Sequence, residues 1–126
     1  MKILVTDDEG IVLSSCRRIL EAEGFEVLMA SSVEEALKTI DAQPLSTPML
    51  LLVDVKMPVH DGMYLMKKVK KKRPHLPIIV MSGYVTRETV KAAENLGAAG
   101  FIAKPFTPEE LLDKLLSVTR KEKFHE

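Results

Sequence analysis

The chain has 126 residues and a mass of 14.1 kDa, with 46% apolar and 29% charged residues, which is typical of one globular domain and excludes a disordered chain. Eighteen basic residues balance eighteen acidic ones, so nucleic-acid binding through bulk charge is not expected. The one cysteine excludes an internal disulfide and a multi-cysteine zinc site. No apolar run approaches the ~20 residues of a membrane span, and the first residues lack a signal peptide, so we expect a cytoplasmic protein that does not bind membranes.

Five short, mainly apolar segments recur along the chain, and each predicts a β-strand. The second contains Glu26, which suits a strand at the edge of a sheet. The others are continuously apolar, as expected of strands buried on both faces. In chain order the segments are Ile3–Val5, Phe25–Met29, Met49–Val53, Ile78–Met81 and Phe101–Ala103.

An amphipathic helix is predicted after each strand. The first has apolar positions at Ile11, Cys16, Ile19 and Leu20 and stops at Gly24. Each of the other four begins after a residue that can cap a helix N-terminus, and the first and last of these open capping boxes. The capping residues are Ser32, Asp61, Thr86 and Thr107.

Strands that alternate with helices indicate an α/β fold with right-handed crossovers and a parallel five-stranded sheet. Residues 1–121 are expected to form this domain, and residues 122–126 a polar C-terminal tail.

The zero net charge conceals an uneven distribution of charge along the chain. Residues 1–63 hold 5 basic and 11 acidic side chains, whereas residues 64–126 hold 13 basic and 7 acidic ones. The basic excess includes a cluster at residues 67–73, which is either a solvated helix end or a docking patch for an acidic partner.

Polar and charged residues follow four of the five strands. In open parallel sheets, ligands bind outside the carboxyl ends of the strands. The residues expected at that edge are Asp7, Asp8 and Glu9 after the first strand, Asp54 after the third, Ser82 after the fourth and Lys104 after the fifth.

Three carboxylates that converge in a small space require raised pKa values or a cation between them. A cluster of carboxylates without histidine or cysteine suits Mg²⁺, which keeps coordination positions open for phosphate oxygens. A lysine and a hydroxyl beside it can hold further phosphate oxygens, and a carboxylate can itself be the nucleophile. These residues therefore indicate phosphoryl transfer onto an aspartate.

Over nearly its whole length, the chain resembles the receiver domain of two-component response regulators. The matching segments are residues 2–9, residues 52–58 with Asp61-Gly62, residues 81–84, residues 97–101 and residues 104–106. The resemblance implies a flavodoxin-like (βα)5 doubly wound sandwich with strand order 2-1-3-4-5. It also implies a receiver domain whose phosphoryl donor is a sensor histidine kinase or a phosphotransfer protein.

The resemblance assigns a role to each site residue. Asp54 is the expected phosphoacceptor, and Lys104 and Ser82 are expected to contact phosphoryl oxygens. Asp8, Asp54 and the backbone carbonyl of Lys56 are expected to ligate Mg²⁺, with Asp7 acting through a bound water. The Lys104–Pro105 bond is expected to be cis.

Two further features follow from the same family. Ser82 and Phe101 occupy the switch positions, and their movement is expected to change the surface formed by the fourth helix, the fifth strand and the fifth helix. Ser82 stands where threonine is frequent, and Phe101 lacks the hydroxyl of the tyrosine variant, which favours its inward state. Lys56 and Tyr84 overlook the site and are expected to tune the lifetime of the aspartyl phosphate, unless they are only exposed loop side chains.

Other functions fit the residues less well. Aspartate-nucleophile phosphohydrolases place a second aspartate two residues after the nucleophile, where this chain has Lys56. A flavodoxin-like cofactor binder needs a phosphate loop after the first strand, where Asp7-Asp8-Glu9 repels phosphate. A degenerate receiver that only binds a protein would not need the complete acidic and lysine set.

We therefore expect a signalling domain that phosphorylates and dephosphorylates itself and has no separate substrate. Its signal is expected to pass to a downstream protein target or to an output domain, because the sequence is compatible both with a stand-alone regulator and with a piece of a longer chain. Homodimerisation through the surface of the last two helices and the last strand stays open.

Overall fold

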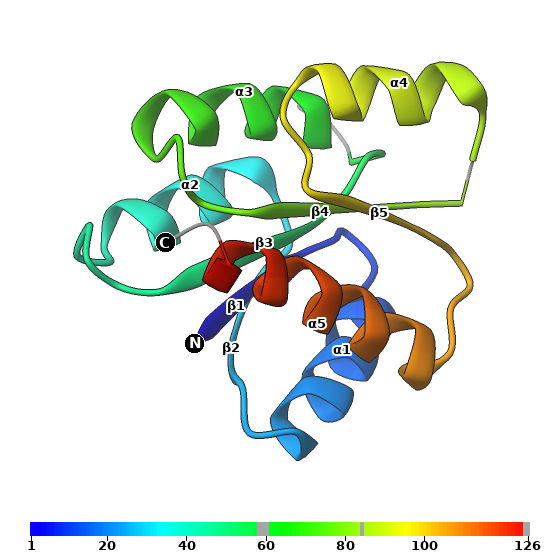
Figure 1. Cartoon of the computed structure of the whole chain (residues 1–126), viewed down its shortest axis with the longest axis horizontal. Helices are drawn as coiled ribbons and strands as arrows, with labels where there is room; N and C mark the ends of the chain where they lie inside the picture. The colour runs from blue at the N-terminus through cyan, green and yellow to red at the C-terminus, as the bar shows by residue number, and fades with distance from the viewer. Residues whose placement is uncertain (58–60, 84, 125–126) are drawn as a thin grey trace.

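The computed structural model describes residues 1–57, 61–83 and 85–124, in which five strands alternate with five helices (Figure 1). The strands are β1 Lys2–Thr6, β2 Glu26–Ala30, β3 Met49–Asp54, β4 Ile78–Ser82 and β5 Gly100–Ala103. The helices are α1 Gly10–Ala22, α2 Val33–Asp41, α3 Gly62–Lys72, α4 Arg87–Asn95 and α5 Pro108–Phe124. Every predicted strand and helix is present. The ends of the strands match the predicted ends or differ from them by one residue.

The strands form one parallel sheet in the order β2-β1-β3-β4-β5, which confirms the predicted fold. Glu26 is exposed on the edge strand β2, as its charge indicated. The register places Thr6 beside Val53 and Ser82 beside Ala103, so the carboxyl ends of the strands lie at one edge of the sheet, on the right in Figure 1.

Helices cover both faces of the sheet. Helices α2, α3 and α4 pack on one face, and α1 and α5 pack on the other (Figure 1). Cys16 lies on the buried side of α1, and burial raises the pKa of its thiol to about 11. Ile11, another of the apolar positions of this helix, lies in its first turn and is 75% exposed.

The predicted N-caps of four helices are confirmed. The side chains of Ser32, Asp61 and Thr86 each accept a hydrogen bond from the backbone N–H three residues later. Thr107 and Glu110 form a complete capping box, since each side chain accepts from the other's backbone N–H. The box expected at Ser32 is only half formed, because the carboxylate of Glu35 accepts from the hydroxyl of Ser31 instead.

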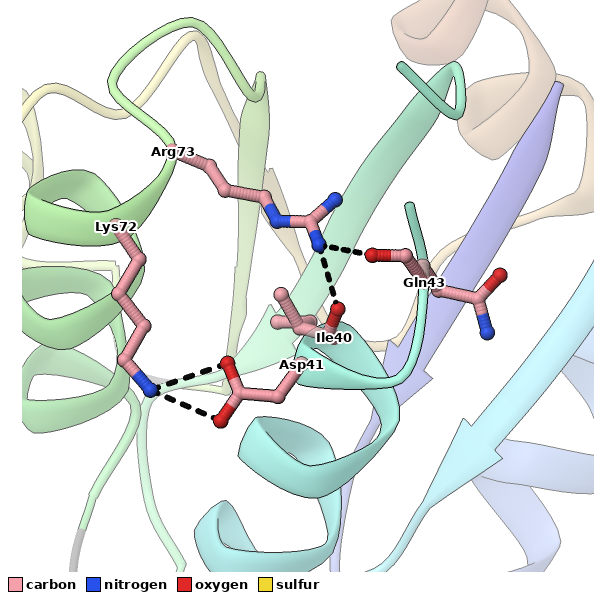
Figure 2. A network of polar contacts seen from close by, with 5 residues as sticks. All are labelled: Ile40, Asp41, Gln43, Lys72 and Arg73. Atoms are coloured by element: carbon pink, nitrogen blue, oxygen red, sulfur yellow. Dashed lines mark hydrogen bonds and ion pairs between the residues drawn. The ribbon is translucent and has the colours of Figure 1, made fainter. Parts of the chain in front are cut away.

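Three of the six basic residues at positions 67–73 join α3 to the end of α2 and to the turn that follows α3. Lys72 pairs with Asp41 at 2.9 Å, and the guanidinium of Arg73 donates to the carbonyl oxygens of Ile40, at 2.7 Å, and of Gln43. Figure 2 shows how these side chains join α3 to the end of α2. Lys70 donates to the carbonyl oxygens of two residues in the turn that follows α3. These contacts support a structural role for the three residues, and the docking interpretation stays open for the exposed lysines at 67, 68 and 71.

Helix α5 extends into the segment that was predicted to be a tail. It continues to Phe124, past the predicted start of the tail at residue 122. The domain boundary at residue 121 stays a prediction. None of the helices in the described part of the chain combines the length and apolarity needed to cross a membrane.

Candidate functional site

The carboxyl ends of β1 and β3 bring three aspartates together. Asp7 follows β1 and is fully buried, Asp8 is exposed, and Asp54 ends β3 with 6% of its surface exposed. One carboxylate oxygen from each lies within 4.8 Å of the others. Carboxylate oxygens at this spacing are the donor set of a hard divalent cation, so the residues fit Mg²⁺.

Backbone contacts hold the first aspartate in place. The N–H of Asp7 donates to the carbonyl oxygen of Ala30 at 3.1 Å, which continues the pairing of β1 with β2. Its carboxylate Oδ1 accepts from the N–H of Glu9 at 2.9 Å. The carboxylate of Asp7 is therefore fixed on the side where the chain turns into α1.

Lys104 provides the cation of the site. Its Nζ lies 2.6 Å from Oδ2 of Asp7, 3.4 Å from Oδ2 of Asp54 and 3.8 Å from Oε1 of Glu9. Its backbone N–H donates to the carbonyl oxygen of Ser82 at 2.8 Å. The Lys104–Pro105 bond is cis, which confirms the expectation from the family resemblance.

Burial and neighbouring charge set the protonation of the central groups. Burial, followed by the negative charge of Asp7, raises the pKa of Asp54, although Lys104 and a hydrogen bond from the backbone of Lys56 act in the opposite direction. Burial by itself lowers the pKa of Lys104, but the hydrogen bond and charge of Asp7 and the charge of Asp54 together raise it. Lys104 is therefore a cation at neutral pH.

Gly62 is a site residue to which the sequence analysis gave no role beyond its place in a motif. Its N–H donates to the carbonyl oxygen of Val55 at 2.8 Å. A Cβ at this position would lie 2.2 Å from the backbone oxygen of Asp54, closer than two such atoms can approach. The signal in the sequence was a glycine immediately after an N-cap, where helix propensity disfavours it.

The structure places the other predicted residues near the same edge. Ser82 ends β4 and is buried, and Phe101 in β5 is half-buried beside Val80 against the core beneath α2, α3 and α4. The side chain of Lys56 is exposed. Tyr84 lies outside the described residues, so its expected influence on the site stays a prediction, as do the switch roles of Ser82 and Phe101.

A groove of about 530 Å³ adjoins Lys104 on the α1 side of the site. Its walls come from the start of α1 and from the segment after β5 and include Glu9, Ile11, Val12, Lys104, Pro105 and Phe106. The exposed side chain of Ile11 contributes an apolar surface to this groove.

Comparison with known proteins identifies one family. The family model of the response regulator receiver domain matches residues 3–116. A response regulator receiver domain protein from Methanospirillum hungatei JF-1 is 36% identical, with a TM-score of 0.87 over 97% of this chain and 96% of that one. A receiver domain protein from Clostridium thermocellum is 32% identical, with a TM-score of 0.90 over 99% and 98% of the two chains.

Curated relatives are longer than this chain. The alkaline phosphatase synthesis transcriptional regulatory protein PhoP of Bacillus subtilis is 31% identical over 95% of this chain, which spans 49% of that protein. The putative response regulator NtrX-like of Rickettsia bellii is 33% identical over 87% of this chain, which spans 23% of it. The match is therefore to the receiver part of larger regulators.

Proposed function

Because this chain belongs to the response regulator receiver domain family, we propose that it accepts a phosphoryl group on Asp54 from a sensor histidine kinase or a phosphotransfer protein. The observation that carries the proposal is the convergence of Asp54 with Asp7, Asp8 and Lys104 at the carboxyl edge of the sheet. The domain acts on itself and has no separate substrate.

In the proposed step, a carboxylate oxygen of Asp54 attacks the phosphorus of a phosphohistidine. The P–N bond breaks, and the departing imidazole nitrogen keeps the electron pair. Asp8, Asp54 and the carbonyl of Lys56 would hold Mg²⁺, with Asp7 acting through a water. When bound, the ion offsets the negative charge of the carboxylates and of the phosphoryl group.

The ammonium of Lys104 has a second part in this proposal. It pairs with Asp7 and lies 3.4 Å from Asp54, so a short movement of its side chain reaches an oxygen of a phosphoryl group on Asp54. The hydroxyl of Ser82 is proposed to bind another oxygen.

The output of the domain is proposed to be a surface change. Movement of Ser82 toward the phosphoryl group vacates space into which the half-buried ring of Phe101 turns. The surface formed by α4, β5 and α5 then binds a downstream protein target, an output domain or a second copy of the chain.

The test is the intact mass of the protein after incubation with acetyl phosphate, with and without Mg²⁺. Wild type and Asp113→Asn, an exposed aspartate on α5, are expected to gain one phosphoryl group only with Mg²⁺, and Asp54→Asn is expected to gain none. No adduct on folded wild type would favour the degenerate, protein-binding receiver. An adduct that persists in Asp54→Asn would place the acceptor elsewhere.

A further inference from the structure

Glu9 is an acidic residue at the mouth of the site that the proposed chemistry does not use. It occupies the N-cap position of α1, yet its side chain makes no capping hydrogen bond. Instead its carboxylate lies 3.8 Å from Nζ of Lys104, and 60% of the side chain is exposed. The carboxylate therefore faces both the lysine and the solvent from which a phosphoryl donor arrives.

Glu9 also shares its lysine partner with the buried groups, because Nζ of Lys104 lies near Glu9, Asp7 and Asp54. Asp7 is fully buried and Asp54 nearly so. Lys104, which contacts both, also lines the groove that begins at α1. Among the described residues lining that groove, Glu9 and Lys104 are the charged ones. The exposed charge of Glu9 is therefore near the ammonium group that also contacts the nearly buried Asp54.

Glu9 adds a negative charge to a site that already holds three carboxylates. Three ionised carboxylates at Asp7, Asp8 and Asp54 would be balanced by Lys104 together with one bound divalent cation. Glu9 adds a further negative charge on the α1 side. Charge at the mouth of a site alters the approach of charged ligands more than it alters the buried chemistry.

We propose that Glu9 is a specificity-determining residue that favours donors with a protonated nitrogen leaving group over acyl phosphates. This inference rests on the proposed role of Asp54. Acetyl phosphate arrives as a dianion, and its P–O bond breaks to release acetate, whose negative charge develops near Glu9. Phosphoramidate arrives as a monoanion with an ammonium group, and its P–N bond breaks to release neutral ammonia.

The same discrimination applies to a protein donor. A phosphohistidine whose imidazole is protonated carries a positive charge on the leaving group, which the carboxylate of Glu9 attracts. Departure of neutral imidazole then leaves the phosphoryl group on Asp54. Glu9 thus disfavours phosphorylation by small acyl phosphates without disfavouring a phosphohistidine donor.

The experiment compares the rates of adduct formation from phosphoramidate and from acetyl phosphate at saturating Mg²⁺. Glu9→Gln is expected to lower the phosphoramidate to acetyl phosphate rate ratio by about threefold, the size expected for one exposed charge. The matched variant Glu23→Gln, at the opposite end of α1, is expected to keep the wild-type ratio. The difference is expected to shrink in 1 M salt.

A binding measurement provides a readout independent of turnover. Inorganic phosphate, titrated into the Mg²⁺-loaded protein and followed by NMR, is expected to bind more tightly to Glu9→Gln than to wild type or Glu23→Gln. An unchanged rate ratio overturns the inference, and so does an equal change for both donors, which would mean that Glu9 acts through Lys104. No adduct on wild type from either donor would instead contradict the proposed function.

Discussion

Lys104 lies closer to Asp7 than to Asp54, with its Nζ 2.6 Å from a carboxylate oxygen of the first and 3.4 Å from one of the second. Asp7 is fully buried, and the ammonium of Lys104 is the cation that contacts its carboxylate. The lysine therefore balances the buried acid before any phosphoryl group is present, and it is already within a short movement of the proposed acceptor.

Replacing that lysine tests its structural part. Lys104→Met leaves two buried carboxylates without their cation, and breaking a buried pair on one side costs about 3 kcal/mol or more. We expect urea unfolding in EDTA to show this loss, and saturating Mg²⁺ to restore more stability in the variant than in wild type. Lys72→Met, which breaks the exposed pair with Asp41, is expected to cost under about 1 kcal/mol. Equal losses would contradict this view.

Removing the charge of Asp54 is expected to stabilise the metal-free protein. Burial and the charge of Asp7 raise the pKa of Asp54, so ionising it costs more in the folded than in the unfolded chain. That cost is absent below the unfolded pKa and grows as the pH rises through the folded pKa. Asp54→Asn should therefore unfold at higher urea than wild type at pH 7 in EDTA, with the difference shrinking toward pH 4. If Asp54→Asn is less stable than wild type at pH 7, the pKa of Asp54 is not raised by folding.

The contact of Gly62 with the acceptor strand predicts a sensitive position. Gly62→Ala places a Cβ against the backbone oxygen of Asp54, and relieving this overlap is expected to cost about 3 kcal/mol and to slow phosphorylation. Thermal unfolding and intact-mass assays measure the two effects. Gly10→Ala is the matched control, because nothing lies within 4 Å of its added Cβ. If both variants behave alike, the close approach is unimportant.

The guanidinium of Arg73 is expected to stabilise the fold without serving the site. Arg73→Met removes hydrogen bonds to the carbonyl oxygens of Ile40 and Gln43 at the end of α2, which should cost about 2 kcal/mol. Denaturant unfolding measures the loss, and the phosphorylation rate from acetyl phosphate should stay at the wild-type value. Lys71→Met, an exposed neighbour, provides the control. A variant as stable as wild type would show that solvent replaces these bonds.

The hydroxyl of Thr6 offers a stabilising substitution. Thr6 is fully buried, and its Oγ1 has no hydrogen-bond partner among the described residues. Thr6→Val keeps the shape and removes the unpaired polar group, so we expect the free energy of unfolding to rise by about 1 kcal/mol. A loss of stability, measured by urea unfolding, would indicate that the hydroxyl binds a buried water.

Much of this molecule follows from local sequence pattern. Apolar runs and capping residues predicted the ten elements, because a run of apolar residues marks a strand buried on both faces and an N-cap bonds to a residue three positions later. The acidic residues and Lys104 could be brought to one place from sequence alone, since the carboxyl ends of parallel strands share one edge of the sheet.

Other features depended on distances between segments far apart in the chain. The preference of Lys104 for Asp7, the approach of Gly62 to Asp54 and the contact of Arg73 with the end of α2 each join different elements. Ile11 is exposed in the first turn of α1 although it is an apolar residue of that helix. Local patterns thus predicted the elements, their N-caps and the chemistry at the strand ends, whereas contacts between distant segments depended on how the elements pack.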